Sequence, residues 1–532
     1  MHAWRQRPES CGSRGSRHLA GSVRGAAKPD RGETGTVTHI PARPAPIVAG
    51  ERDAARPGAR TWLPFLPLLA AALLLAYQLF VPPVTGIADN GDFEKVLGYV
   101  GLRHAAESRG DKYYQWVNRD FRFAPFGWYQ SGHLGTETAI ALATRTVAGL
   151  AGGETFDLRW QGAAHLLLLL AGLALCVAAT APLPPAIRLT VAVFLCFVFS
   201  DAGYAAPLNS FYGQAASLAF LLLAVGGAAA WMRHRERPGP WPLLFLAAGT
   251  GFVFSKPQEA LQAGFVALAF LSLNRASGWL RPRAAVPLAL VPVLVGAAVM
   301  VKAPVNVRLE SPFHMVFSEI VPHSPDAAAD LRWFGLEPQL ARYARVSAYD
   351  RGSPIGRPAF QREFSARVSS LRILQFYLAH PARLLELATR RAEQAFTLQP
   401  PHIGTFEKAS GQPARALTSR FTHWSTLKRL LIPEHLLTIV LLFGGSLALC
   451  AWQWRTSPRP ECWECLALLS LMPLVAFGIC IVGDCYENER HLFTFNAMTD
   501  LVLVADATFA ASLLATRRQA AGSALLDQPS KR

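Results

Sequence analysis

Residues 62–81 read WLPFLPLLAAALLLAYQLFV, a run without a single charged side chain. Residues 284–301, AAVPLALVPVLVGAAVMV, form a second run of the same kind. An uncharged apolar run of about 18 residues or more is long enough to cross the hydrocarbon core of a bilayer as a helix. The two runs therefore predict an integral membrane protein built from helices.

The overall composition agrees with this prediction. The chain has 532 residues, of which 51% are hydrophobic and 17% charged, and its formal net charge is +16. Much of the positive charge lies in the two tails and in short loops between apolar runs, which is the pattern of positive-inside topology. A nucleic-acid partner is therefore not expected, and the expected surroundings are a lipid bilayer.

Further apolar runs extend the prediction to a polytopic, all-α membrane protein with about ten transmembrane helices, within a range of 9–12. In this topology each short Arg cluster between spans falls on the cytoplasmic side. The predicted spans are residues 62–81, 158–179, 187–199, 215–232, 241–254, 260–273, 284–301, 435–452, 465–482 and 492–514.

The spans divide the chain into regions of different character. The Arg-rich N-terminal segment has too little apolar surface to order itself and predicts a disordered cytoplasmic tail. Residues 136–150 are apolar on one side and favour an interfacial helix, with an extra span as the alternative. The predicted regions are the tail 1–61, a transmembrane module 62–301 with a first outer loop 82–156, a large helical extracytoplasmic loop 302–434, the C-terminal transmembrane helices 435–514 and a cytoplasmic tail 515–532.

The first group of candidate functional residues directly follows the first span. Asp89, Asn90, Gly91 and Asp92 place two carboxylates where the chain leaves the lipid. Paired acids can act as a general base, hold a divalent cation or bind sugar hydroxyls. The structural alternative is an Asn-Gly turn followed by Asp92 as a helix cap.

Two more polar groups lie at the outer ends of later spans. Asn209 and Tyr212 precede the fourth span, where Tyr is also a common interfacial anchor. Lys256 and Glu259 lie between the fifth and sixth spans. They could bind a phosphate and support it, or form a local ion pair with a snorkelling Lys.

The fourth group leads into the last span. Glu487, Arg490 and His491 stand at the lipid boundary, where an arginine fork suits a phosphate or diphosphate group. Asn496 and Asp500 lie deeper, on one face of the last helix. An intramembrane Asp is costly, so Asp500 either faces a cavity or joins two helices.

All four groups fall on the same side of the predicted topology. Together they predict an outward cavity that holds acids and cations. Such a cavity suits an anionic lipid-linked donor, because the acids could activate an acceptor hydroxyl while the cations stabilise the leaving phosphate.

With these four polar groups, the chain resembles the GT-C glycosyltransferase superfamily. Its members are multi-span enzymes that use polyprenyl-phosphate sugars and carry an acid in the first outer loop. More narrowly, it is similar to bacterial hexose transferases of surface-glycan biosynthesis. The resemblance covers residues 62–515, and its acids differ from the usual adjacent pair because Asn90 and Gly91 separate them. The matching segments are residues 90–93, 209–213, 255–259, 334–336, 380–381, 403–404 and 489–493.

The resemblance implies a membrane glycosyltransferase that moves a hexose from a polyprenyl-phosphate donor to a cell-envelope glycan or lipid acceptor on the extracytoplasmic face. It also implies the bacterial inner membrane, while the positions of the Arg clusters predict that both termini are cytoplasmic. Asp92 and Asp89 are the catalytic candidates, with Asp92 preferred, and a divalent cation, Mg²⁺ or Mn²⁺, is compatible with the acids. The predicted donor-phosphate ligands are Arg490, His491 and Lys256, and the predicted substrate ligands are Asn90, Asn209, Tyr212, Glu259 and Glu487.

Two other functional classes fit a multi-span chain with a large outer loop. One is a transporter or flippase for lipid-linked glycans, and the other is a polysaccharide ligase or polymerase. A transporter is expected to show related halves with broken spans near the midplane. A ligase needs no acidic base, so replacing Asp89 or Asp92 discriminates it from a transferase.

Overall fold

The computed structural model of the protein describes residues 62–129, 134–303 and 305–526. The predicted N-terminal tail, residues 1–61, and the end of the predicted C-terminal tail lie outside these residues. The described part is mostly helical, as predicted, and the last helix continues beyond the predicted end of its span, to Leu526.

Apolar helices occupy all ten predicted spans. Seven helices of the described part are long and apolar enough to cross a membrane, or eight if the bent pair Pro185–Phe199 and Ala202–Leu208 forms one span. Two shorter apolar helices lie at the fifth and sixth predicted spans, so the number of crossings stays a prediction. The helices are η1 (Leu63–Phe65), α1 (Leu66–Phe80), α5 (Arg159–Ala179), α6 (Pro185–Phe199), α8 (Gly213–Arg233), α9 (Trp241–Val253), α11 (Ala263–Ser277), α12 (Pro282–Val301), α19 (Leu436–Thr456), α20 (Pro460–Gly483) and α22 (Phe493–Leu526).

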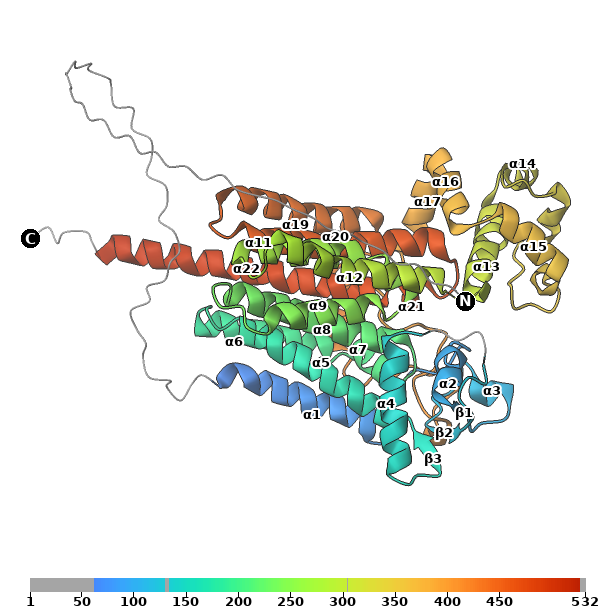
Figure 1. Ribbon diagram of the computed structural model, residues 1–532, viewed down its shortest axis with the longest axis horizontal. Helices are drawn as coiled ribbons and strands as arrows, with labels where there is room; N and C mark the ends of the chain where they lie inside the picture. Colours follow the sequence, from blue (N-terminus) through green and yellow to red (C-terminus); the bar gives the residue numbers. More distant parts are fainter. Residues whose placement is uncertain (1–61, 130–133, 304, 527–532) are drawn as a thin grey trace, which may run out of the picture. The chain divides into compact units, whose positions relative to one another are not determined.

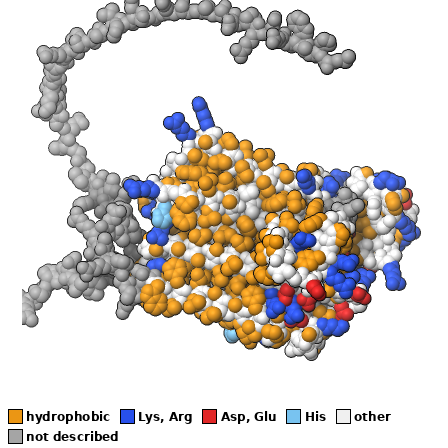
Figure 2. Space-filling model, turned by 60° about the horizontal axis from the view of Figure 1, so that its bottom comes forward, with side chains coloured by type: hydrophobic (Ala, Val, Ile, Leu, Met, Phe, Trp, Pro, Cys, Tyr) orange, Lys and Arg blue, Asp and Glu red, His pale blue; other side chains and the backbone are white. Residues whose placement is uncertain are grey.

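These helices run side by side as a bundle (Figure 1). Helix α8 is the central one, since 78% of its apolar window is buried, and it packs against α5 and α9. Hydrophobic side chains cover the middle of the face drawn in Figure 2, while charged side chains gather mainly toward its two ends. An apolar belt between two charged ends is the surface that a bilayer requires.

The two ends of the bundle differ in character. At one end, the Arg-rich loops meet through ion pairs of Arg235 with Glu461 (3.3 Å) and of Arg275 with Glu464 (2.6 Å). We call this the Arg-rich end. At the other end, the loop end, the first outer loop and helices α13–α17 lie together (Figure 1).

The first outer loop contains a small antiparallel sheet with strand order β1-β2-β3. The all-α prediction missed this sheet, because its strands are three or four residues long, too short for their alternation to stand out from a loop. Helix α4 runs across the bundle helices in Figure 1, as expected of an interfacial helix. The elements of this loop are α2 (Glu94–Val100), β1 (Leu102–His104), α3 (Arg109–Lys112), β2 (Asp120–Phe123), α4 (Thr136–Leu150) and β3 (Thr155–Asp157).

The large loop is helical, as predicted, and residues 358–379 within it form two helices, α15 and α16. The break falls at Val368 and Ser369, whose backbones are extended, and the Ser369 side chain accepts from Arg372 N to cap the second helix. The helices are α13 (Val305–His314), η3 (Met315–Ile320), η4 (Val321–His323), α14 (Ala327–Trp333), η5 (Pro338–Tyr343), η6 (Pro354–Gly356), α15 (Pro358–Arg367), α16 (Ser370–Ala379), α17 (Pro381–Ala392), η7 (Lys408–Ser410) and α18 (His423–Leu431).

A buried ion pair joins the large loop to the last span. Lys428 of α18 donates to Asp500 Oδ1 and to Asn496 Oδ1, both at 2.7 Å, and the Lys428 and Asp500 side chains are fully buried. Tyr204 and Trp424 donate to Asp500 Oδ2 at 2.6 and 2.8 Å. Of the two interpretations of Asp500, the structure therefore favours the one in which it joins helices.

Candidate active site

Four segments that are far apart in the sequence meet at the loop end. They are the turn after α1, the start of α8, the short helix α10 (Pro257–Ala260) and the short helix α21 (Asn488–His491). Gly213, the first residue of α8, makes this approach possible. A Cβ atom at Gly213 would lie 2.7 Å from Cγ of Lys256 and 2.8 Å from the Ser255 carbonyl oxygen.

Of the two acids in the turn after α1, Asp92 is the one that remains accessible. Its side chain is 27% exposed, and its carboxylate pairs with Lys95 Nζ (2.5 Å) and Arg490 Nη2 (2.8 Å). Burial raises the pKa of Asp92, but the charges of Lys95 and Arg490 outweigh it and hold the pKa well below its ordinary value. Asp92 is therefore an ionised carboxylate held between two cations.

Asp89 is closed off from any substrate. Its Oδ1 accepts from the backbone N–H groups of Gly91 (2.6 Å) and Phe93 (3.0 Å), and its Oδ2 lies 2.8 Å from His104 Nε2. Burial raises the pKa of Asp89, although His104 counteracts this. It is Asp89, and not Asp92, that binds the backbone at the start of α2, so the expectation that Asp92 caps this helix is wrong.

Arg490 lies at the centre of the site. Its Nε donates to Glu487 Oε2 (2.7 Å) while Nη2 contacts Asp92, and its guanidinium lies over the Tyr212 ring, 4.9 Å from the centroid. Its carbonyl oxygen accepts from Gln214 Nε2 (3.2 Å), which ties α21 to α8. A planar fork held on three sides is pre-organised for bidentate binding of an anion.

Lys256 is a second cation near Arg490, and His491 follows Arg490 as a largely neutral imidazole near pH 7. Lys256 Nζ is buried and has no hydrogen-bond partner among the described residues. Burial lowers the pKa of Lys256 to about 8, and burial together with the charges of Arg490 and Lys256 lowers the pKa of His491 to about 4. The ammonium group of Lys256 thus has unused donors, and both Glu259 and Arg490 act on its charge.

Asn90, Tyr212 and Glu487 hold the turn in place. The Asn90 side chain donates to Glu487 Oε2 (2.6 Å), and the Asn90 backbone N–H donates to Tyr212 Oη (2.8 Å). Glu487 adopts a left-handed backbone (φ 52°) and its Oε1 lies 3.7 Å from His402 Nε2. Burial raises the pKa of Glu487, but the charge of Arg490 outweighs this and brings the pKa to about 2.

Two predicted substrate ligands face elsewhere. The Asn209 side chain donates to the carbonyl oxygens of Leu79 and Thr85, both at 2.8 Å, and is buried. Glu259 is buried as well, and its Oε1 accepts from Thr494 (2.8 Å). In the structure, Asn209 thus holds the exit of the first loop from α1, and Glu259 contacts the first turn of α22, so their role as substrate ligands stays a prediction.

Other site residues were not predicted. Lys95 lies three positions after Asp92, so a helical spacing rule could have indicated it. His104 and His402 are single histidines with no local signal, and only the tertiary fold brings them to Asp89 and Glu487.

The site does not assemble a metal-binding set in the described part of the chain. No group of three or more His, Cys, Asp or Glu side chains is arranged to hold a metal ion there. Asp92, the accessible one of the two acids in the turn, already faces two cations. The residues described therefore do not fit a divalent cation, and no step below is assigned to one.

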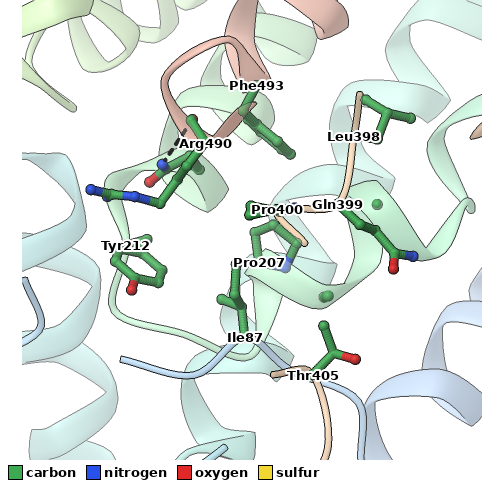
Figure 3. A pocket seen from close by; sticks show the side chains of 12 residues that line it. Ile87, Pro207, Tyr212, Leu398, Gln399, Pro400, Thr405, Arg490 and Phe493 are labelled. Carbon is green, nitrogen blue, oxygen red and sulfur yellow. Dashed lines mark hydrogen bonds between the residues drawn. The ribbon is translucent and has the colours of Figure 1, made fainter. Parts of the chain in front are cut away.

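A small apolar cavity is lined in part by Arg490. Its volume of about 20 Å³ gives room for about one water molecule. Figure 3 shows Ile87, Pro207 and Phe493 around it, with the Arg490 guanidinium directed away and Tyr212 below. The site thus combines a cationic group with apolar surface at the level where the helices end.

Comparison with known proteins defines the class. A family model described as the YfdI N-terminal transmembrane domain matches residues 58–523, and YfdI is a GT-C-like glycosyltransferase. The fold and the match together define a multi-pass membrane protein of a family whose namesake is a GT-C-like glycosyltransferase. The chain belongs to the YfdI N-terminal transmembrane domain family.

Among solved structures, the chain is similar to the apo oligosaccharyltransferase of Archaeoglobus fulgidus. The identity is 12% and the TM-score 0.39, over 87% of this chain and 52% of the archaeal one. The chain therefore spans about half the length of that enzyme. No curated protein sequence matched the chain.

Proposed function

We propose that the protein transfers a hexose from a polyprenyl-phosphate-linked donor to an acceptor hydroxyl at the loop end. We further propose that the loop end faces the outside of a bacterial inner membrane and that both termini are cytoplasmic. The Arg-rich loops at the opposite end of the bundle support this orientation, because short basic loops stay on the cytoplasmic side.

The observation that carries the proposal is the unpartnered ammonium of Lys256 beside Arg490 and His491. Burial, followed by the charge of Arg490, lowers the pKa of His491, and burial together with the same charge lowers the pKa of Lys256. A bound phosphate would offset the repulsion by Arg490 and satisfy the free donors of Lys256.

In the proposed reaction the acceptor hydroxyl oxygen attacks C1 of the donor sugar. The bond between C1 and the phosphate oxygen breaks, its electron pair leaves with the polyprenyl phosphate, and the hydroxyl proton passes to Asp92. Arg490 and Lys256 stabilise the negative charge on the leaving phosphate. Asp92 suits the role of base because it is ionised and remains partly exposed.

Because Asp92 contacts Arg490, donor binding would also change the pKa of Asp92. When Arg490 turns to the phosphate, Asp92 loses one of the two cations that hold its pKa low. Its pKa then rises, and it becomes a better proton acceptor. Donor binding would in this way activate the base only when the leaving group is in place.

The proposal is tested with purified protein in bilayer nanodiscs and radiolabelled polyprenyl-phosphate glucose. Lys256→Met removes the free ammonium, and Lys302→Met removes an exposed lysine on the same side as a matched control. Transfer to an envelope-glycan fraction should fall at least tenfold in Lys256→Met, with a higher KM for the donor, and stay unchanged in Lys302→Met. Equal transfer by both variants, or no consumption of labelled donor by wild type, would contradict the proposal.

A further inference from the structure

Two exposed tyrosines flank a buried histidine next to the candidate active site. Tyr349 is 67% exposed and Tyr486 39% exposed. The ring centroids of Tyr349 and Tyr486 lie 5.5 and 4.6 Å from that of His314, which is buried. We call these two exposed rings the tyrosine platform.

Hydrogen bonds hold both rings in place. Tyr349 Oη donates to Glu310 Oε2 (3.0 Å), and Tyr486 Oη donates to Ser318 Oγ (3.2 Å). Exposed aromatic side chains that are fixed in advance lose little conformational entropy when a ligand binds them.

His314 is itself fixed between two segments. The backbone N–H of Ala348 donates to its Nε2 (3.0 Å), so the ring proton is on Nδ1, which faces Asp484 Oδ1 at 3.4 Å. Asp484 also accepts from Ser311 Oγ (2.8 Å). The histidine thus joins the large loop to the turn that precedes α21, and the platform spans this junction.

The platform lies beside Asp92. Tyr486 precedes Glu487, whose carboxylate binds both Asn90 and Arg490. Arg490 in turn contacts Asp92 at 2.8 Å. A ligand on the platform would therefore extend toward the accessible carboxylate.

The chemistry of the platform selects one class of ligand. A sugar ring has apolar C–H faces that pack on tyrosine rings and hydroxyl groups that donate to carboxylates such as Glu310 and Asp484. The same acids repel an anionic lipid headgroup, and an apolar chain would leave them unpaired. We propose that Tyr349 and Tyr486, with Glu310, bind a neutral saccharide whose hydroxyl is presented to Asp92. That this saccharide is the acceptor of the transfer rests on the proposed function.

The test is saturation-transfer NMR on the whole protein in nanodiscs, with the neutral saccharide pool released by mild acid from the envelope of the source organism. Wild type should transfer saturation to sugar-ring protons. Tyr349→Ala and Tyr486→Ala should each weaken binding about tenfold, while the Tyr→Phe variants, which keep the ring, stay within threefold of wild type. Tyr99→Ala removes a tyrosine of similar exposure on α2 and is the control.

Donor binding, measured separately with radiolabelled polyprenyl-phosphate glucose, separates this inference from the proposed function. Unchanged donor binding in both Tyr→Ala variants, with loss of the saccharide signal, supports the platform. No saccharide signal in wild type, equal signals in all variants, or a signal from lipid-headgroup protons in its place overturns the inference even when donor is bound and consumed. Saccharide binding without any donor binding would instead count against the proposed donor alone.

Discussion

Replacement of Arg490 by lysine tests the geometry of the site most finely. Two nitrogens of one guanidinium serve two acids, because Nη2 contacts Asp92 at 2.8 Å and Nε contacts Glu487 at 2.7 Å. Lysine keeps the charge but offers one nitrogen, which cannot reproduce both contacts and cannot bind a phosphate bidentately. A hydrogen bond to a charged group contributes about 1.5–3 kcal/mol. Loss of one such bond, about 2 kcal/mol, corresponds to about a 30-fold fall in kcat/KM.

The assay is the kinetics of hexose transfer, with Arg383→Lys as the matched control. Arg383 also uses two nitrogens, to Asp330 (2.7 Å) and to the Ile320 carbonyl oxygen (3.1 Å), within the large loop. Both variants lose a bond of the same kind, so their melting temperatures should fall similarly. Only Arg490→Lys should lose transfer. A value of kcat/KM within threefold of wild type for Arg490→Lys would refute the assignment of Arg490 to the donor phosphate.

Three further predictions follow from the other contacts. Asp89→Asn should lower the free energy of unfolding by about 1–3 kcal/mol, measured as a lower melting temperature, because the Asp89 carboxylate holds the turn. The variant should retain transfer, and a stable but inactive variant would contradict this role. Donor binding should weaken as the pH rises through about 8, where Lys256 loses its proton, and Lys256→Arg should abolish that dependence in a binding titration. Lys428→Met should destabilise the protein by about 3–5 kcal/mol, since Asp500 is left buried and unpaired, and Lys428→Met/Asp500→Leu should regain part of the loss in thermal unfolding; a double variant less stable than the single one would argue against a simple ion pair.

The helices could be predicted from the sequence because burial in lipid demands long apolar runs. Every predicted span coincides with an apolar helix to within a few residues at its start. The outer polar groups could be placed together for the same reason, since spans that alternate in direction bring every second connection to one end. Arg490 and Asp92 were accordingly predicted in one cavity, and they lie 2.8 Å apart.

What could not be predicted depends on tertiary contacts. Asp89 and Asp92 look equivalent in the sequence. In the fold, His104 of strand β1 pairs with Asp89 and buries its carboxylate, while the Asp92 carboxylate stays accessible. Asn209 resembles a substrate ligand, yet the backbone of the α1 exit takes both its amide hydrogens. The short sheet strands carry too little pattern to separate from a loop.

The central claim is that Asp92 receives the proton of the acceptor while Arg490 holds the donor phosphate. The most direct test is single-turnover transfer from radiolabelled polyprenyl-phosphate hexose by Asp92→Asn, with donor affinity measured on the same sample. We predict a fall in the transfer rate of at least 100-fold, as expected for the loss of a general base. Donor affinity should be equal or higher, because Arg490 is released from its contact with the carboxylate. Transfer at the wild-type rate by Asp92→Asn would contradict the account.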